Sequence, residues 1–552
     1  MPGRDFVEKV KIGLAAASVL AVLVSFVLAV LRKRSEKNAV AREFLQTTAL
    51  VKVGGWSFNV YQSFIGVLLL LTIASTINYT AYGSNLSVRR YDSYDLLHYY
   101  LAPKYFDELG YFRLLPALII ADDEAGRTCT QRTRTYLFQD KDDYRFKSVE
   151  HALARNKEIK SHFNPERWTQ FVHDVTFIQR KSGNLGCRLW RMMLRDHGFN
   201  GTPAWVFMAR PIVEHVPVEY MKVATSLDML LIIAMLAVIS WAFGSETALL
   251  AWLFITLSYS FRWPIIGWSL LRYDWLAAMV VGLCMIKKEK HMAAGAFFGY
   301  ATAMRYFPAI WMFGIVAKGG HSIVATLRAK APMFKEGLWL GIPTTYLKMA
   351  MGFFLIVALL IGASIQRDGI EAHKTSFDNI FAHIKPHNLS SRRMGLVIAA
   401  AYNGETDQKL ITDENKMEVK RIEGKVRFFS IVMMILMGVF MGRKKDWEVV
   451  GLGLIPYFWL TTSSYYYYAL RVTGVVVHAS DLSKPRNIIG LLMLFAMELF
   501  SNASEHLNPG NRYFLVSVLC VMLAIYSFTQ VAFLGWEWIK ERKTIDTAQD
   551  TP

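Results

Sequence analysis

Long apolar runs recur along this chain and constrain its fold more than any other feature. A helix needs about 20 apolar residues to cross roughly 30 Å of hydrocarbon. Runs such as VLLLLTIASTINY (67–79) return through much of the sequence, and 53% of the 552 residues are hydrophobic. A transmembrane β-barrel would instead show short segments of alternating polarity. The sequence therefore predicts an all-α polytopic membrane protein.

The apolar runs predict a bundle of about 11 to 14 transmembrane helices, several of them short. A break is expected near Pro308, because proline interrupts helical hydrogen bonding. The predicted segments are 11–31, 60–80, 225–243, 246–261, 273–287, 291–306, 308–318, 342–363, 425–441, 449–463, 466–478, 487–502 and 513–535.

Lysine and arginine cluster in short loops, which indicates the orientation of the bundle. A net charge of +18 would suggest nucleic acid in a soluble protein. Here basic loops beside helices follow the positive-inside rule, favour membrane lipid as a partner and give no reason to expect nucleic acid. The loops assigned to the cytoplasm are 32–42, 287–290, 443–445, 484–486 and 540–543. The chain is expected in a cell (inner) membrane, with 81–222 and 364–424 outside.

This assignment of the loops to the two sides of the membrane divides the chain into five parts. Residues 105–222 are expected to form one extracytoplasmic, mainly helical domain, since PERWTQFVHDVTFIQRK and CRLWRMMLRDHG both have helical patterning. The parts are 1–58 (first helix and basic cytoplasmic loop), 59–104 (helix and acidic first external loop), 105–222, 223–538 (bundle, with external loop 364–424) and 539–552 (cytoplasmic tail).

The four cysteines fall into two kinds of surroundings. Cys284 and Cys520 lie in apolar runs and are expected to be packing residues. Cys129 and Cys187 both lie in the long polar segment. If that segment is outside the cytoplasm these two can form a disulfide, although the sequence does not give their separation. No cysteine spacing typical of a metal site is present.

The stretch RRYDSYDLLHYY (89–100) holds the first candidate site, shortly after an apolar run. Asp92 and Asp95 stand three apart and so share one face of a helix, which His98 continues. Aspartates are also ordinary at a solvated helix start. A carboxylate near the membrane interface, however, is costly unless it is used.

The neighbours of these acids suggest a ligand. Arg89 and Arg90 precede them and could hold a phosphate. Tyr99 and Tyr100 could line a sugar site, although tyrosines also form ordinary interface belts.

Other polar residues are expected on the same side of the membrane. Asp122 and Asp123 suit a divalent metal or sugar hydroxyls, and an ordinary acidic loop explains them equally well. Asn200 lies in a turn just before the next helices. The remaining candidates are the helix-end residues Arg272 and Asp274, and His383, Lys385, Asn388, Arg392 and Arg393 of the external loop.

Arginine and lysine outside the cytoplasm run against the positive-inside trend, and binding a lipid phosphate would explain them. An exposed loop with no specific role is the alternative for the external-loop group. Arg305 lies inside an apolar run, where an arginine is usually paired or faces a cavity.

Several of these segments resemble the GT-C superfamily of polytopic glycosyltransferases. The first aspartate-bearing loop after an outward helix is one similarity. RYDWLAAMVVGLCMIKKEKHMAAGAFFGYATAMRYFPAIWMF (272–313), FDNIFAHIKPHNLSSRRMGL (377–396) and TTSSYYYYALRV (461–472) are similar to parts of polyprenyl-phosphate-sugar-dependent mannosyl- and arabinosyltransferases. The long segment 105–222 and the additional N-terminal helix depart from that pattern.

The resemblance implies a reaction and roles for the residues. A lipid-linked sugar donor would meet a glycan, glycolipid or protein acceptor, and one displacement would invert the anomeric centre. Asp95, or Asp92 in second place, would act as general base. His98, Tyr99 and Tyr100 would shape the sugar pocket, and Arg272, Arg305, Lys385, Arg392 and Arg393 would be candidates for the phosphate.

Two other classes of function stay open at this point. A transporter or flippase would place ionisable residues at mid-membrane and show inverted repeats, whereas here the carboxylates lie near the outer face and no repeat is visible. A non-catalytic envelope-assembly subunit would tolerate the loss of Asp95. No nucleotide P-loop, HExxH or GxSxG motif is present.

Overall fold

In the computed structural model, eight helices of the described residues are long and apolar enough to cross a membrane. The structure describes residues 3–36, 49–53, 56–86, 93–126, 128–139, 144–181, 186–195, 198–263, 269–384, 392–404 and 413–549. The eight spans are built on α1 (Arg4–Ser35), α3 (Val60–Tyr79), α13 (Met221–Phe243), α18 (Phe313–Arg328), α19 (Thr344–Asp368), α22 (Asp413–Met441), α26 (Pro485–Leu507) and α27 (Arg512–Gln549). The architecture is that of an α-helical polytopic membrane protein.

The remaining predicted segments form shorter helices, so long helices alone do not reach the expected count of about 11 to 14. The segment 449–463 divides into two helices, and part of 466–478 is a 3-10 helix instead of an α-helix. Hydropathy finds an apolar run but does not tell whether one helix or several fill it. The short elements of the bundle are α14 (Ser245–Leu257), α16 (Asp274–Lys287), α17 (His291–Arg305), α23 (Asp446–Gly451), α24 (Leu454–Leu460), η10 (Tyr465–Leu470) and α25 (Arg471–Ala479).

The break expected near Pro308 is confirmed. α17 ends at Arg305, Tyr306 adopts a positive φ of 55°, and the 3-10 helix η7 (Phe307–Met312) leads into α18. At the other end of the chain, α27 continues through most of the predicted polar tail.

Short elements connect and flank the long helices. The 3-10 turns are η1 (Ser84–Leu86), η5 (Val218–Tyr220) and η6 (Tyr259–Phe261), and the remaining helices are α20 (Ile370–Ile384) and α21 (Leu396–Ala401). Three antiparallel strand pairs complete this part: β1 (Ala49–Val53) with β2 (Trp56–Asn59), β5 (Leu338–Trp339) with β6 (Ile342–Pro343), and β7 (Arg393–Met394) with β8 (Ser463–Ser464). Asn59 and Gln62 form a reciprocal capping box that starts α3.

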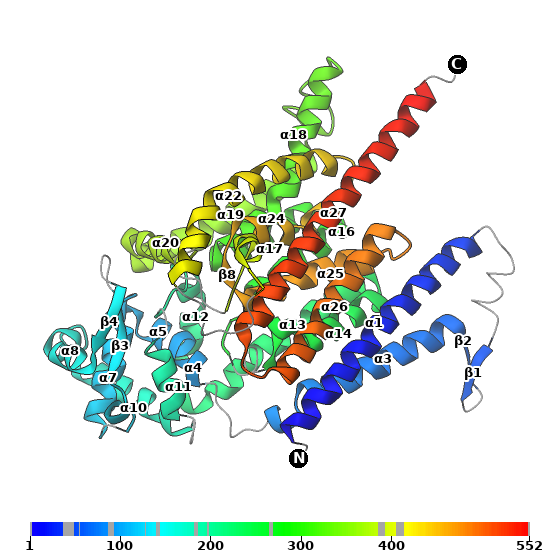
Figure 1. The fold of residues 1–552 in the computed structure, drawn as a ribbon. Helices are drawn as coiled ribbons and strands as arrows, with labels where there is room; N and C mark the ends of the chain where they lie inside the picture. Colours follow the sequence, from blue (N-terminus) through cyan, green and yellow to red (C-terminus); the bar gives the residue numbers. More distant parts are fainter. Residues whose placement is uncertain are drawn as a thin grey trace.

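Residues 93–215, which we call the head domain, gather at one end of the molecule, opposite the C-terminal end of α27 (Figure 1). It is mainly helical, as predicted, but it also contains an antiparallel hairpin in which Thr135 pairs with Ser148. Its elements are α4 (Ser93–Leu96), the π-helix η2 (Leu97–Leu101), α5 (Ala102–Lys104), α6 (Phe106–Leu109), α7 (Leu114–Glu124), η3 (Thr130–Arg132), β3 (Thr135–Gln139), β4 (Tyr144–Ser148), α8 (Val149–Ala154), α9 (Asn156–Lys160), α10 (Pro165–Lys181), α11 (Gly186–Met193) and α12 (Pro203–His215).

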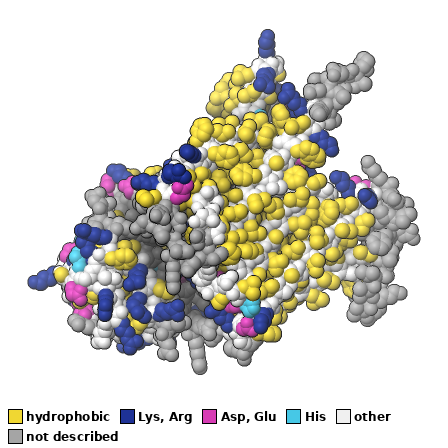
Figure 2. Space-filling view, viewed as in Figure 1, with side chains coloured by type: hydrophobic (Ala, Val, Ile, Leu, Met, Phe, Trp, Pro, Cys, Tyr) yellow, Lys and Arg dark blue, Asp and Glu magenta, His cyan; other side chains and the backbone are white. Residues whose placement is uncertain are grey.

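The two parts of the molecule differ in surface chemistry. Hydrophobic side chains cover the visible face of the bundle, whereas charged side chains lie on the head domain and at the helix ends (Figure 2). Phe354 and Phe428, for example, are 66% and 71% exposed. Large exposed apolar side chains of this kind are expected where a helix faces lipid instead of water.

Small residues let α17 and α19 pack backbone against backbone. A Cβ on Gly295 would lie 1.9 Å from the carbonyl oxygen of Met349, and one on Gly299 would lie 2.5 Å from that of Phe353. Gly352 of α19 approaches Met292 in the same way. The sequence GAFFG of α17 is thus a small-xxx-small contact of the kind that brings membrane helices together.

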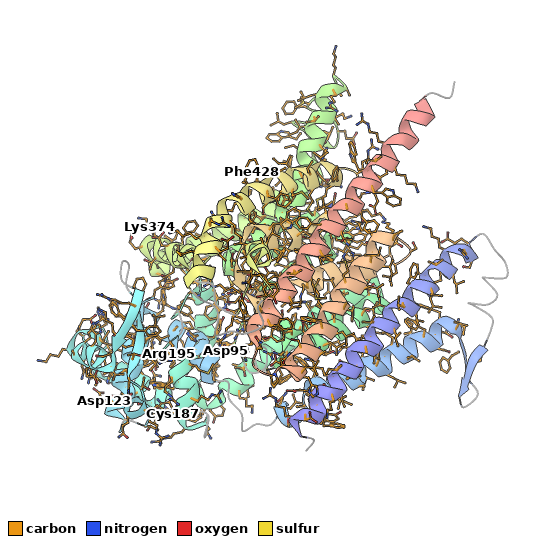
Figure 3. All side chains as sticks on the ribbon, viewed as in Figure 1. Asp95, Asp123, Cys187, Arg195, Lys374 and Phe428 are labelled. Atoms are coloured by element: carbon orange, nitrogen blue, oxygen red, sulfur yellow. A yellow bond between two sulfur atoms is a disulfide. The ribbon has the colours of Figure 1, made fainter. Side chains whose placement is uncertain are left out.

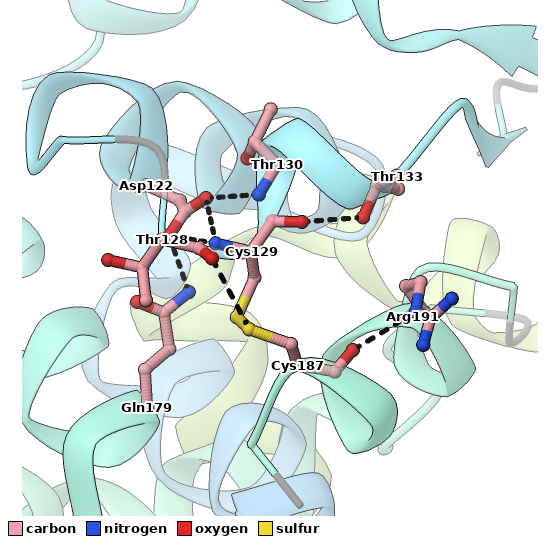
Figure 4. Close-up of a disulfide and its surroundings, with 8 residues drawn as sticks. All are labelled: Asp122, Thr128, Cys129, Thr130, Thr133, Gln179, Cys187 and Arg191. Atoms are coloured by element: carbon pink, nitrogen blue, oxygen red, sulfur yellow. Dashed lines mark hydrogen bonds between the residues drawn. A yellow bond between two sulfur atoms is a disulfide. The ribbon is translucent and has the colours of Figure 1, made fainter. Parts of the chain in front are cut away.

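A disulfide and a buried carboxylate hold the head domain together (Figure 4). Cys129 and Cys187 are bonded across 58 residues, a pairing that the sequence had left open. Asp122 accepts hydrogen bonds from the backbone amides of Cys129 and Thr130 and from the side chain of Gln179. Cys284 and Cys520 are buried and free, as expected.

A buried ion pair fixes the first helices of the head domain onto α10. Lys104 Nζ lies 2.6 Å from Asp174, which also accepts hydrogen bonds from the hydroxyls of Tyr105 and Tyr100. Burial lowers the pKa of Lys104, and the neighbouring carboxylate opposes that shift. The stretch after Asp95 is therefore anchored through its own side chains.

Candidate functional site

Asp95 lies where the head domain meets the helical bundle, and it forms the centre of the candidate site (Figure 3). Its carboxylate is in a direct ion pair with Arg272 and accepts a hydrogen bond from the hydroxyl of Ser269. The side chain of Asp95 is 4% exposed and that of Arg272 is 10% exposed. A carboxylate removed from water in this way needs such a partner to remain ionised.

The loop that carries Arg272 is held by the bundle and by the head domain. The backbone amides of Arg272 and Tyr273 donate to the carboxylate of Asp228 on α13, at 3.0 and 3.1 Å. The indole of Trp205, on α12, donates to the carbonyl of Leu271 at 2.9 Å. The loop position is thus set by hydrogen bonds that do not involve Asp95.

Aromatic rings enclose this ion pair. The guanidinium of Arg272 lies 4.7 Å from the ring centre of Tyr466 and 5.6 Å from that of Tyr99. Tyr99 and Trp205 meet edge to face at 5.2 Å. Burial raises the pKa of Tyr99, and the cations of Arg272 and Arg305 oppose that shift in part, so Tyr99 is a neutral phenol at physiological pH.

A second arginine, Arg305, lies against the same rings. Its guanidinium is 5.9 Å from the ring centre of Tyr99 and 5.5 Å from that of Trp205. Arg305 is buried and donates to the carbonyl of Met304. The carboxylate of Asp274 acts on the charge of Arg305, although the two side chains do not form a direct ion pair among the described residues. The position of Arg305 is fixed from the head domain, because the hydroxyl of Thr202 donates to the carbonyl of Ala303.

Arg393 belongs to an element that leads into this site. The strand pair β7–β8 places Arg393 opposite Ser464, and the amide of Tyr465 donates to the carbonyl of Arg392. The next residue is Tyr466, whose ring lies against the guanidinium of Arg272. Arg393 is buried and Arg392 is exposed. Asp274 is buried beside the site and accepts a hydrogen bond from Tyr300 at 2.9 Å.

The structure places several other predicted residues elsewhere. Tyr100 points into the head domain toward Asp174, whereas its neighbour Tyr99 faces the site. Asp122 is engaged by the disulfide loop (Figure 4), and Asp123 lies far from Asp95 in the head domain (Figure 3). Asn200 is exposed.

The remaining predicted residues are His98 and a group that the structure does not describe. His98 is buried one residue before Tyr99. Arg89, Arg90, Asp92, Lys385 and Asn388 lie outside the described residues, as does the side chain of His383.

Sequence reasoning did not select Ser269, Trp205, Tyr466 or Asp228 as site residues. The run of four tyrosines at 465–468 was one available signal, since it marked an unusual aromatic segment. Asp228 was another, since it is a carboxylate within the predicted segment 225–243. Ser269 had no local signal. The roles of all four depend on which segments the fold brings together.

A divalent metal was one prediction for this region. Among the described residues, no group of three or more His, Cys, Asp or Glu side chains is arranged to hold a metal ion. The ionised groups at the centre are instead one carboxylate and two guanidiniums, a set that suits an anionic ligand together with a proton acceptor.

No protein-family model, curated protein or solved structure matches this chain. The class that the fold defines is that of α-helical polytopic membrane proteins. A more specific function can therefore be argued only from the side chains around Asp95 and their chemistry.

Proposed function

We propose that this chain is an integral membrane glycosyltransferase that transfers a sugar from a polyprenyl-phosphate donor to an acceptor hydroxyl on the extracytoplasmic side. The observation that carries the proposal is the enclosed ion pair of Asp95 and Arg272, with the buried cation of Arg305 beside it. One acid, two cations and a wall of rings meet the needs of this reaction without a metal.

Each group has a defined part in the reaction. The carboxylate of Asp95 accepts the proton of the acceptor hydroxyl as its oxygen bonds to the anomeric carbon. The bond from that carbon to the phosphate oxygen breaks, and the electron pair leaves with the phosphate. Arg272 and Arg305 stabilise the charge of the departing phosphate, and Tyr99 and Trp205 stack on the sugar ring.

The ion pair of Asp95 and Arg272 also fits this proposal. Arg272 neutralises Asp95 where both side chains are nearly removed from water. A donor phosphate gives Arg272 an alternative partner, and the carboxylate then becomes free to accept a proton. Ser269 still donates to Asp95 and keeps it oriented.

The segments that resemble GT-C transferases support the same reading. Asp95, Arg272, Arg305 and Tyr466 all come from stretches that carry the resemblance, and the fold brings these four together.

Transport is the second candidate, and one observation favours it. Arg471 and Glu498 form an ion pair at 2.8 Å with both side chains 0% exposed, inside the bundle. Such buried charges mark ion or proton paths in many transporters. Here, however, Arg471 is also bonded to Ser258 and Ser260, and the amide of Tyr259 donates to Glu498. The pair therefore fixes the loop that leads to the site.

The test is sugar transfer by purified protein in liposomes that contain polyprenyl-phosphate mannose or polyprenyl-phosphate arabinose. Asp95→Asn and Asp95→Glu should each lower turnover about 10²- to 10⁴-fold, while Asp481→Asn, a half-exposed aspartate in the loop before α26, keeps wild-type turnover. Folding is checked by size-exclusion elution and helical circular dichroism. Full turnover in both folded Asp95 variants would overturn the proposal, and lipid flux without donor cleavage would favour transport.

Arg305 provides an independent arm of the same assay. Arg305→Gln removes a charged hydrogen-bond donor from the phosphate site, which should cost about 1.5–3 kcal/mol of donor binding and raise the donor KM roughly 10- to 100-fold. Arg328→Gln, an exposed arginine at the end of α18, serves as the matched control. An unchanged donor KM in Arg305→Gln would show that Arg305 does not bind the donor phosphate.

A further inference from the structure

A cavity of about 520 Å³ lies where α6 and the loop after it face the junction of α19 and α20. Its volume falls within the roughly 300–1,000 Å³ typical of small-molecule sites. Gly369, with a φ of 78°, turns the chain between the two helices. Phe106, Tyr111 and Phe112 form one part of the wall, and charged side chains form much of the remainder.

The charges around this cavity nearly balance. Asp107, Asp368 and Glu371 line it together with Arg113 and Arg367. A third arginine, Arg210, is 6% exposed and lies behind the wall, 2.7 Å from Asp107 and 3.0 Å from Asp368. A site with three acids and three arginines favours a neutral, polar ligand over a free cation or anion.

Asp368 has a buried carboxylate with unused hydrogen-bonding capacity. Its side chain is 2% exposed, yet in the described part of the chain neither oxygen of its carboxylate accepts a hydrogen bond, despite the nearby Arg210. Two nitrogens of Arg210, Nε and Nη1, are likewise buried without an acceptor. Buried polar groups are nearly always hydrogen-bonded, so the hydrogen-bonding capacity that these atoms retain suits a hydroxyl-bearing ligand.

A series of buried, packed rings lies between this cavity and the Asp95 site. Tyr111 stacks on Phe199 at 5.8 Å, Phe199 lies 6.0 Å from Trp205, and Trp205 contacts Tyr99. A Cβ on Gly201 would lie 2.6 Å from the ring of Phe199, so the turn before α12 lets these rings approach.

We propose that this cavity binds a neutral oligosaccharide, a part of the glycan acceptor that lies away from the reacting hydroxyl. This inference rests on the proposed glycosyltransferase function. Sugar hydroxyls donate to carboxylates and accept from guanidiniums, and sugar rings stack on aromatic faces. Asp368 accepts from one hydroxyl, and Glu371 and Arg367 hold others at the mouth of the cavity.

The test measures binding apart from catalysis. Saturation-transfer NMR is recorded on the full-length protein in nanodiscs with mannobiose, maltose, lactose and cellobiose as probes. At least one disaccharide should bind the wild type, Asp368→Asn should weaken it tenfold or more, and Glu371→Gln should weaken it severalfold. Glu214→Gln, an exposed glutamate on α12, is the matched control and should bind as the wild type.

The outcomes separate the two proposals. If none of the four probes binds the wild type, or if binding survives in both folded cavity variants, the oligosaccharide site is overturned. Because Glu371 is exposed, its variant remains informative even if Asp368→Asn does not fold. Binding that depends on the cavity in a chain whose Asp95→Asn variant keeps full turnover would retain the sugar site and overturn the proposed base.

Discussion

Asp95 and Arg272 lie 177 residues apart in the sequence and form a direct ion pair between the head domain and the bundle. Both side chains are nearly removed from water. Each depends on the other for compensation of its charge, because an unpaired buried ion is far more costly than an exposed one. The ion pair therefore couples the position of the head domain to that of the loop before α16.

Replacing one member of this ion pair should lower the free energy of unfolding by a large amount, because the other member stays buried and charged. Arg272→Gln alone leaves the charge of the Asp95 carboxylate uncompensated, and Asp95→Asn alone does the same to the guanidinium of Arg272. Each variant should destabilise the protein by about 3–5 kcal/mol. The double variant should cost clearly less than the sum of the two. Unfolding in detergent, read as a double-mutant cycle, measures this. The exposed pair Arg4–Glu8 gives the control cycle, where coupling should be near zero. Additive losses at Asp95 and Arg272 would contradict the description.

Removing the disulfide should loosen the head domain. The bond between Cys129 and Cys187 closes 58 residues, and Cys129→Ser with Cys187→Ser should cost about 2–4 kcal/mol. A reducing agent should lower the Tm of the wild type and leave that of the double variant unchanged. If the reducing agent lowers the Tm of the wild type and of the double variant equally, its effect does not come from the disulfide between Cys129 and Cys187.

Close packing of α17 on α19 makes the glycines of that contact intolerant of substitution. Gly299→Ala should destabilise the protein by about 1–3 kcal/mol, because its Cβ would meet the carbonyl of Phe353. Gly362→Ala is the matched control on α19, since nothing lies within 4 Å of a Cβ there. Thermal unfolding of the two variants should differ clearly. Equal Tm values would show that the helices do not approach as described.

Acidification should weaken the α19–α20 junction through His373. Burial lowers the pKa of His373 below its usual 6.5, and its ring hydrogen-bonds the hydroxyl of Ser364. Below pH 6.5 the unfolded chain binds a proton that the folded chain resists, so stability falls as the pH drops. The Tm of the wild type should fall more between pH 7 and pH 5 than that of His373→Gln. Parallel pH profiles would exclude this role.

Much of the fold could be predicted from the sequence because apolar runs have a direct physical meaning. The long helices α3, α13 and α26 begin and end within a few residues of the predicted segments, since length and hydropathy decide them. The hairpin β3–β4 was missed because each strand is only five residues long. A strand of that length carries little periodic signal.

The site could be predicted only as a set of residue types. Asp95, Tyr99, Arg272 and Arg305 were selected because charge and aromatic rings beside apolar runs are unusual. Adjacent residues of a helix point about 100° apart, but the sequence could not show which of Tyr99 and Tyr100 would face the site. Nor could it show that Asp122 binds the loop after Cys129, since that contact exists only in the folded head domain.

The most direct test of the account is a cryo-EM map of the protein in nanodiscs with a polyprenyl-phosphonate mannose analogue that cannot be cleaved. Phosphonate density is expected against the guanidiniums of Arg272 and Arg305, with the sugar beside Asp95 and Tyr99. A map in which the analogue is bound with its phosphonate away from both arginines, while Asp95 and Arg272 remain paired and enclosed, would contradict it.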